Sequence, residues 1–211
     1  MTTALLKKLE REGSQASETS DDLFSRFWTV DALYQALNAG LLEDPKRLEL
    51  IHGRIIRKMP QNPIHTFLRR RFGQLLRDSM TGFVVMEESP LRLAIDGEPV
   101  PDVFVASGSE KDYQTRHPTQ AETVLVIEVS NTTADYDLGE KALLYAQSGI
   151  SDYWVVLVNE AVIVRHRQPS AGGYAEVTRL ADTDMLSPLA LPGATWTINE
   201  LLGRGEASEE N

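Results

Sequence analysis

Three side chains suited to metal-assisted chemistry on phosphate esters stand in the middle of the sequence. Asp102 follows a proline, Glu128 lies at the end of the apolar run VLVIEVS, and Lys141 comes after it. Two carboxylates at the ends of neighbouring strands supply the hard oxygen ligands that suit Mg²⁺ or Mn²⁺. A nearby ammonium can orient water or balance charge on a phosphate. These residue types therefore predict a divalent-metal phosphodiesterase, and a nuclease in particular.

The elements around Glu128 and Lys141 predict how these residues meet. TVLVIEV has the length and β-branched content of a central strand buried on both faces. Glu128 then lies at the carboxyl edge of the sheet, where α/β proteins bind their ligands. The segment Leu138–Ser148 is expected to be a helix leading to a second buried strand, DYWVVLV, so the two strands should be parallel. Asp137, Lys141 and Tyr145 fall one turn apart on one face of this region.

The first part of the sequence predicts two helices and a hairpin. Thr29 can cap a short helix. LELI-HG-RIIRKM is expected to form a hairpin with its turn at HG and with Glu49 in its first strand. Asn62-Pro63 supplies a cap and a first-turn proline for an amphipathic helix that carries His65 near its start. These elements precede the two acidic strand ends.

Several further strands complete an α/β pattern. FVVMEE, LRLAI and VPDVFVA are predicted to be short strands, with Asp102 near the start of the last one. AVIVRHRQ and YAEVTRL are predicted to form a further hairpin around Gly172-Gly173. His166 in this hairpin is expected to be an exposed polar residue.

Length and composition predict one folded domain with two tails. The chain has 211 residues, of which 42% are hydrophobic and 25% charged, enough for a full core. Residues 1–22 are expected to be a mobile polar tail with a short helix at Ala4–Glu12, residues 23–203 a single domain, and residues 204–211 an acidic tail. The absence of cysteine excludes disulfides and thiolate chemistry. No membrane span or signal peptide is apparent, which predicts a cytoplasmic protein.

The charge balance opposes nucleic-acid binding. A net charge of −10 and a pI near 4.9 are opposite to the basic footprint of most such proteins. The two tails carry −4 of this charge and leave −6 for the body. The body has local basic clusters that can contact phosphates or form solvated faces; these are Arg54, Arg57 and Lys58, and Arg69, Arg70, Arg71 and Arg77.

Several stretches together resemble a known family. They are LELIHGRIIRKMP, His65 early in a helix, VPDVFVA, VLVIEVSNTTADYDLGEKALLYAQSGISDYWVV and SPLALPG. In this order they are similar to the Uma-two family of the restriction-endonuclease-like PD-(D/E)XK superfamily, over about residues 30–202. The resemblance implies a mixed sheet flanked by helices. It also implies metal ligation by Asp102, Glu128 and the Val129 carbonyl.

One position departs from the superfamily pattern. The superfamily usually has a catalytic lysine two residues after the second acid, where this chain has Ser130. The resemblance makes Lys141 the candidate replacement, reaching back from the following helix. In the implied mechanism, one or two Mg²⁺ ions held by Asp102 and Glu128, with Glu49 as a further candidate ligand, activate water while Lys141 orients the nucleophile.

Two further side chains are expected to support this site. His65 and Arg69, one helical turn apart, can face the substrate or bind a phosphate, and Tyr145 can hydrogen-bond a ligand carboxylate. The resemblance thus implies a Mg²⁺- or Mn²⁺-dependent endodeoxyribonuclease acting on DNA. A homodimer is also implied, because restriction enzymes of this fold often work as dimers and a double-strand cut needs two sites.

Each of these roles has a structural competitor. Asp102 after a proline can simply cap a turn, and Asp137 and Lys141 can form an ordinary helix ion pair. His65 can be a packing histidine, and Glu49 a residue of an ordinary strand. Two other functions stay open: a binding or assembly module of the same fold that does not cut, favoured by Ser130, and metal-free hydrolysis of a sugar by two carboxylates.

Overall fold

The computed structural model describes residues 27–93 and 96–204, which fall into two compact units. One unit contains residues 27–58 with 96–97, and the other contains residues 59–93 with 98–204. The expected N-terminal tail, its short helix and the acidic tail beyond Arg204 lie outside the described residues. The single-domain assignment of residues 23–203 stays a prediction. No helix in the described ranges has the length and apolarity that crossing a bilayer requires.

The smaller unit is a helix beside a hairpin, as the sequence predicts. Helix α3 (Val30–Asn38) starts at Thr29, whose hydroxyl accepts the Ala32 N–H at 3.2 Å. A 3₁₀ turn, η1 (Pro45–Arg47), leads into strands β1 (Leu48–Ile51) and β2 (Arg54–Arg57). The two residues at the hairpin turn, His52 and Gly53, have φ of 47° and 70°. Positive φ at both positions matches the twist of a tight hairpin.

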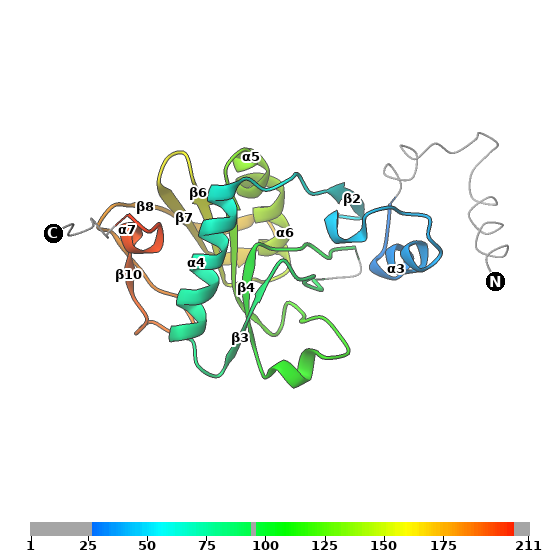
Figure 1. Ribbon diagram of the computed structural model, residues 1–211, viewed down its shortest axis with the longest axis horizontal. Helices are drawn as coiled ribbons and strands as arrows, with labels where there is room; N and C mark the ends of the chain where they lie inside the picture. The colour runs from blue at the N-terminus through cyan, green and yellow to red at the C-terminus, as the bar shows by residue number, and fades with distance from the viewer. Residues whose placement is uncertain (1–26, 94–95, 205–211) are drawn as a thin grey trace. The chain divides into compact units, whose positions relative to one another are not determined.

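The larger unit is built on a six-stranded sheet with the order β3-β4-β5-β6-β7-β8 (Figure 1). Only β5 and β6 run parallel, which confirms the predicted β-α-β unit, and all other neighbours are antiparallel. The sheet is therefore mixed, as expected. Its strands are β3 (Phe83–Glu87), β4 (Val103–Ser107), β5 (Thr123–Ser130), β6 (Asp152–Leu157), β7 (Val162–Ser170) and β8 (Gly173–Ala181).

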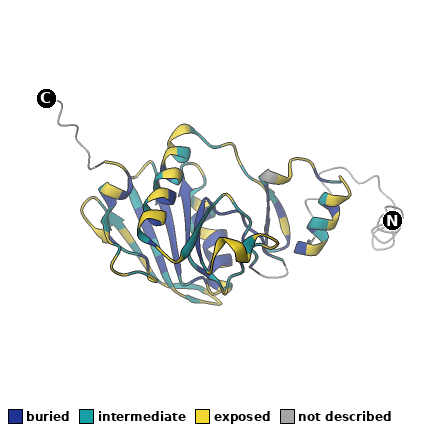
Figure 2. Cartoon of the chain, turned by 60° about the horizontal axis from the view of Figure 1, so that its bottom comes forward, coloured by how far each residue is buried: buried dark blue, intermediate teal, exposed yellow. Residues whose placement is uncertain are grey.

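Helices cover both faces of this sheet. Helix α4 (Pro63–Ser79) begins at Asn62, whose side chain accepts the His65 N–H at 3.0 Å, and packs on β3, β4 and β5. Helix α6 (Ala142–Gln147) packs on β7 and β8. Strand β6 is buried along its whole length, and Figure 2 shows the buried colour concentrated in the central strands. Burial on both faces explains why these strands are continuously apolar in sequence.

The helix expected over Leu138–Ser148 begins earlier, at Ala134, and contains a wider turn. Its parts are α5 (Ala134–Tyr136), the π-helical turn η3 (Asp137–Lys141) and α6. A π turn inserts one residue into an α-helix and occurs frequently at functional sites. The remaining elements are η2 (Glu110–Tyr113), β9 (Met185–Leu186), β10 (Trp196–Thr197) and α7 (Ile198–Leu201).

Two predictions about local structure are wrong. Leu91 and Leu93 alternate with Arg92 as in a strand, but this segment pairs through a single bridge from Arg92 to Thr119. The rest of LRLAI lies outside the described residues. His166 is 4% exposed instead of solvated, because its ring packs against those of Tyr153 and Tyr174, at centroid distances of 5.2 and 5.5 Å.

Candidate metal centre

Asp102 lies where the start of β4 meets the end of β5. The two strands are antiparallel, with Val103 opposite Ile127, so the residue before β4 comes beside the acidic end of β5. Asp102 Oδ2 accepts the Val129 N–H at 2.8 Å, and the Asp102 N–H points to Glu128 Oε2 at 3.4 Å. The side chain is 4% exposed. Asp102 is therefore held within the sheet and not at a solvated turn.

Glu128 points toward η3 and α6, and one of its carboxylate oxygens accepts hydrogen bonds from two side chains of these elements. Lys141 Nζ lies 2.9 Å from Glu128 Oε1, and Tyr145 Oη donates to the same oxygen at 2.8 Å. The Lys141 and Glu128 side chains are 4% and 3% exposed. Lys141 reaches the acid at the end of β5 from the helix that follows, the direction expected for a displaced lysine.

The π turn and Ser130 shape the approach of Lys141. Ser130 Oγ lies 3.3 Å from Thr133 Oγ1, which donates to Asp137 Oδ2 at 2.6 Å. Burial raises the pKa of Asp137, against the opposing effects of the Lys141 charge and of the two hydroxyls. At the position of the usual lysine, Ser130 thus helps to hold the π turn that carries Lys141.

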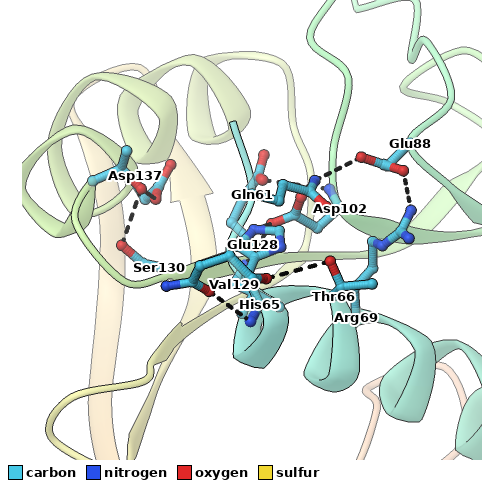
Figure 3. Close-up of polar contacts among 12 residues, drawn as sticks. Gln61, His65, Thr66, Arg69, Glu88, Asp102, Glu128, Val129, Ser130 and Asp137 are labelled. Carbon is cyan, nitrogen blue, oxygen red and sulfur yellow. Dashed lines mark hydrogen bonds and ion pairs between the residues drawn. The ribbon is translucent and has the colours of Figure 1, made fainter. Parts of the chain in front are cut away.

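His65 reaches Asp102 from the first turn of α4 (Figure 3). Its Nε2 lies 3.0 Å from Asp102 Oδ2, while its Nδ1 is buried without a hydrogen-bond partner among the described residues. The ring therefore orients the Asp102 carboxylate, and it is not simply a packing residue.

Glu88 is a neighbour of the site that the sequence did not single out. It follows β3 with a φ of +46°, and its N–H points to the carbonyls of Pro101 at 3.1 Å and Asp102 at 3.2 Å. Its carboxylate accepts Gln61 Nε2 at 2.6 Å and also pairs with Arg69 (Figure 3). A left-handed glutamate is costly in isolation, of order 1–3 kcal/mol. Only the acidic doublet after β3 marks this position in the sequence, and acidic doublets are common on surfaces.

Arg69 is expected to face the substrate or bind a phosphate, but its guanidinium is paired with acids of the protein. Besides its pair with Glu88, its Nε lies 3.9 Å from Glu87 Oε2. Two acids therefore neutralise this guanidinium, so it is not an open phosphate contact. Glu49 is 2% exposed in β1 and belongs to the smaller unit, and its part in the site stays a prediction.

The donor set at the sheet edge fits a hard divalent cation. Asp102 and Glu128 bring two carboxylates together beside the Lys141 ammonium. In a strand the N–H and C=O of one residue point to the same side, so the Val129 carbonyl faces the same side as its N–H, toward Asp102. Within the described ranges no three His, Asp or Glu side chains converge as a metal cluster. Mg²⁺ typically takes one or two carboxylates and keeps several waters, so this smaller set suffices.

A mixed sheet flanked by helices, with acids at the meeting ends of two strands, defines a restriction-endonuclease-like α/β protein. The chain belongs to the Uma2 family, whose model, described as "Putative restriction endonuclease", matches residues 31–199. This confirms the family inferred from the sequence.

One solved structure supports the fold assignment. It is a crystal structure from Anabaena variabilis ATCC 29413 described as "a putative nuclease belonging to DUF820". The two align with a TM-score of 0.67 and 17% identity over 83% of this chain and 98% of the other. At that identity the likeness shows a shared fold. No curated protein matches the sequence.

Proposed function

We propose that the protein is a divalent-metal-dependent endonuclease that hydrolyses phosphodiester bonds of DNA. The observation that carries this proposal is the convergence of Asp102, Glu128 and Lys141 at one buried edge of the sheet. The description of the family and the fold of the Anabaena protein support the reaction class.

Asp102, Glu128 and the Val129 carbonyl are the residues that would hold Mg²⁺ or Mn²⁺. A bound divalent ion lowers the pKa of its water and offsets negative charge on the phosphate. Glu49 remains a candidate for a further carboxylate contact. In hydrolysis a water oxygen bonds to phosphorus, one P–O ester bond breaks, and the departing oxygen takes up a proton.

The protein's own side chains divide the remaining work. Lys141, with its ammonium 2.9 Å from Glu128 Oε1, orients the attacking water and offsets charge on the phosphoryl oxygens. Tyr145 fixes the Glu128 carboxylate from the next helical turn, and His65 fixes Asp102 from α4. Orientation of ligands by such surrounding hydrogen bonds typically changes metal affinity or activity by about 10–100-fold.

DNA as the substrate, a homodimer as the working form and a location in the cytoplasm belong to the same proposal. Symmetric dimers are the commonest oligomers and would place two sites on a duplex. Sedimentation with and without DNA measures the assembly. The non-cutting binding module is the competing function, because Ser130 occupies the position at which the superfamily usually has its catalytic lysine.

Cleavage assays test the proposal. Purified protein is incubated with supercoiled, linear and single-stranded DNA and with RNA, in Mg²⁺, Mn²⁺ or EDTA, beside Asp102→Asn as the control for contaminating nucleases. We expect cutting of DNA that needs the metal and disappears in the variant. Folded wild-type protein that binds nucleic acid but never cuts would favour the non-cutting module.

A further inference from the structure

We infer that the groove along the outer face of α4 binds a single, unpaired strand of the nucleic-acid substrate. This inference rests on the proposed function, which it deepens by naming the form of the substrate. The groove has a volume of about 830 Å³, and its lining contains two arginines and no acidic residue. In a chain with a net charge of −10, a groove lined by two arginines and no acidic residue is a specific feature.

The two arginines present positive charge in different ways. Arg70 is exposed and forms no ion pair among the described residues. Arg71 is fixed by donating from Nε to the carbonyls of Glu200 at 2.9 Å and Leu201 at 3.2 Å, and its charge also acts on the exposed Glu200 carboxylate, which is not part of the groove lining. The neighbouring Arg69 and Arg77, by contrast, each pair with acids of the β3 end. Arg70 and Arg71 are therefore suited to phosphates.

Phe67 supplies an aromatic surface between these charges and the start of the helix. It is 49% exposed, although it lies on the same helix as the fully buried Phe72. A Cβ on Gly203 would lie 3.2 Å from Phe67 Cζ, so the bare glycine backbone lets the chain after α7 approach the ring edge closely. Exposed aromatic rings flanked by arginines are the means by which proteins bind single strands, by stacking bases and neutralising phosphates.

The form of the nucleic acid follows from this arrangement. Within a duplex both faces of each base are covered by neighbouring base pairs, so a base can stack on Phe67 only when its strand is unpaired. The remaining polar lining consists of side-chain amides and a hydroxyl, including Gln61 and Gln74. These groups hydrogen-bond a backbone or a base edge without requiring a defined sequence.

The groove meets the start of the helix that also carries His65. It begins at Gln61 and Asn62, and Asn62 caps the helix turn that places His65 on Asp102. Gln61 also donates to Glu88, whose N–H points to the Asp102 carbonyl. Phe67 and Arg70 follow His65 by two and five residues, so a strand held on them lies along the helix that also carries His65.

Fluorescence anisotropy in EDTA tests the inference without cleavage. The probes are a fluorescein-labelled single-stranded 20-mer and its blunt duplex, each measured between 25 and 150 mM salt, a series with roughly a twofold change in screening length. We expect tighter binding of the single strand. Phe67→Ala should weaken it about tenfold, Phe67→Trp should retain affinity, and Phe67→Leu should behave like alanine although it keeps apolar volume.

Charge variants separate phosphate contact from general attraction. Arg70→Gln should lower the slope of log affinity against log salt by about 0.7 for the single strand. Lys111→Gln is the matched control, because Lys111 lies in η2, in the loop at the far end of β4 and β5, and should change nothing. Melting curves confirm that each variant is folded.

Three results would overturn the inference. They are equal affinity for duplex and single strand, affinity that is unaffected by Phe67→Ala and Arg70→Gln, and a dimer that Phe67→Ala dissociates while oligonucleotide binding persists. The last result would make the groove an interface between two copies. Because no step requires metal or cutting, groove-dependent binding by a protein that never cuts would sink the endonuclease proposal alone.

Discussion

Two buried clusters in the same sheet differ in the number of carboxylates that they bring together. Asp152, at the start of β6, is fully buried and is matched by the guanidinium of Arg167, with contacts of 2.9 and 3.2 Å. The Trp154 indole N–H donates to it at 2.9 Å and the Leu189 N–H at 2.7 Å. At the other end of the parallel pair, Asp102 and Glu128 lie together, with the Lys141 ammonium 2.9 Å from Glu128 and the His65 ring 3.0 Å from Asp102.

This difference separates a structural cluster from a candidate catalytic one. Removing a charge from water is expensive, and a buried ion pair stabilises a fold only when every partner is satisfied. Asp152 with Arg167 meets that condition with protein groups alone. The Asp102–Glu128 cluster instead brings two carboxylates together, and paired carboxylates are ligands that suit a divalent ion. The first cluster should therefore affect stability, and the second metal binding and activity.

The largest expected effect is on cleavage by Glu128→Gln. This change keeps the shape of the side chain but removes one metal-binding charge, so the rate of DNA cleavage in Mg²⁺ should fall at least about 100-fold, as expected for losing several kcal/mol of stabilisation. Initial rates on supercoiled DNA measure it. A rate within threefold of wild type would remove Glu128 from the site.

Lys141→Met should separate orientation of water from metal binding. Without the ammonium, cleavage should fall about 100-fold, within the range for losing one electrostatic contact in a transition state. The variant loses a positive charge 2.9 Å from Glu128 Oε1 that would oppose a metal ion, so Mn²⁺ should raise the melting temperature more in this variant than in wild type. Cleavage and calorimetric melting together check both parts. Full activity would exclude Lys141 from the mechanism.

Asp152→Asn should show the opposite pattern. It leaves the Arg167 guanidinium, 16% exposed, without its carboxylate, and breaking a buried pair in this way costs about 3 kcal/mol of unfolding free energy. Urea denaturation measures that loss. The Mn²⁺ affinity of the folded variant should equal that of wild type. A drop in Mn²⁺ affinity as large as the one caused by Glu128→Gln would show that the two clusters do not differ in function.

The smallest effect concerns the pH dependence of stability and Asp137, which lies near the Asp102–Glu128 cluster. Burial raises its folded pKa above the ordinary value of 3.8, so the folded state holds this proton more tightly than the unfolded state. Its stabilising contribution is therefore present at low pH and is lost as pH rises from about 4 through the raised pKa. Urea melts at several pH values should show wild type losing stability relative to Asp137→Asn over this rise. An unchanged difference would show that Asp137 does not titrate there.

The sequence predicted the strand ends well because burial on both faces leaves a continuous apolar signature. TVLVIEV and DYWVVLV could be recognised as neighbouring parallel strands, and this placed Glu128 at an edge. The position of Asp102 beside it followed from the family resemblance, since antiparallel pairing of β4 with β5 has no local signal. The metal ligation itself is still a prediction.

Other features depend on contacts that no local pattern encodes. Glu88 is held by Gln61, just before α4, and by Arg69 within it. The π turn that ends at Lys141 has the same residue spacing in the sequence as an ordinary helix. His166 is a polar residue in an alternating strand, and its burial comes from Tyr153 and Tyr174 on neighbouring strands. The Asp152–Arg167 pair likewise joins two strands through their register.

Calorimetric titration with Mn²⁺ tests the central claim most directly, using wild type, Asp102→Asn and Asp152→Asn at a temperature where all three are folded. If the Asp102–Glu128 cluster is a metal site, wild type and Asp152→Asn bind Mn²⁺ with the same affinity and Asp102→Asn shows no binding heat. Equal affinity in all three proteins, or no binding by wild type even with DNA present, would contradict the account.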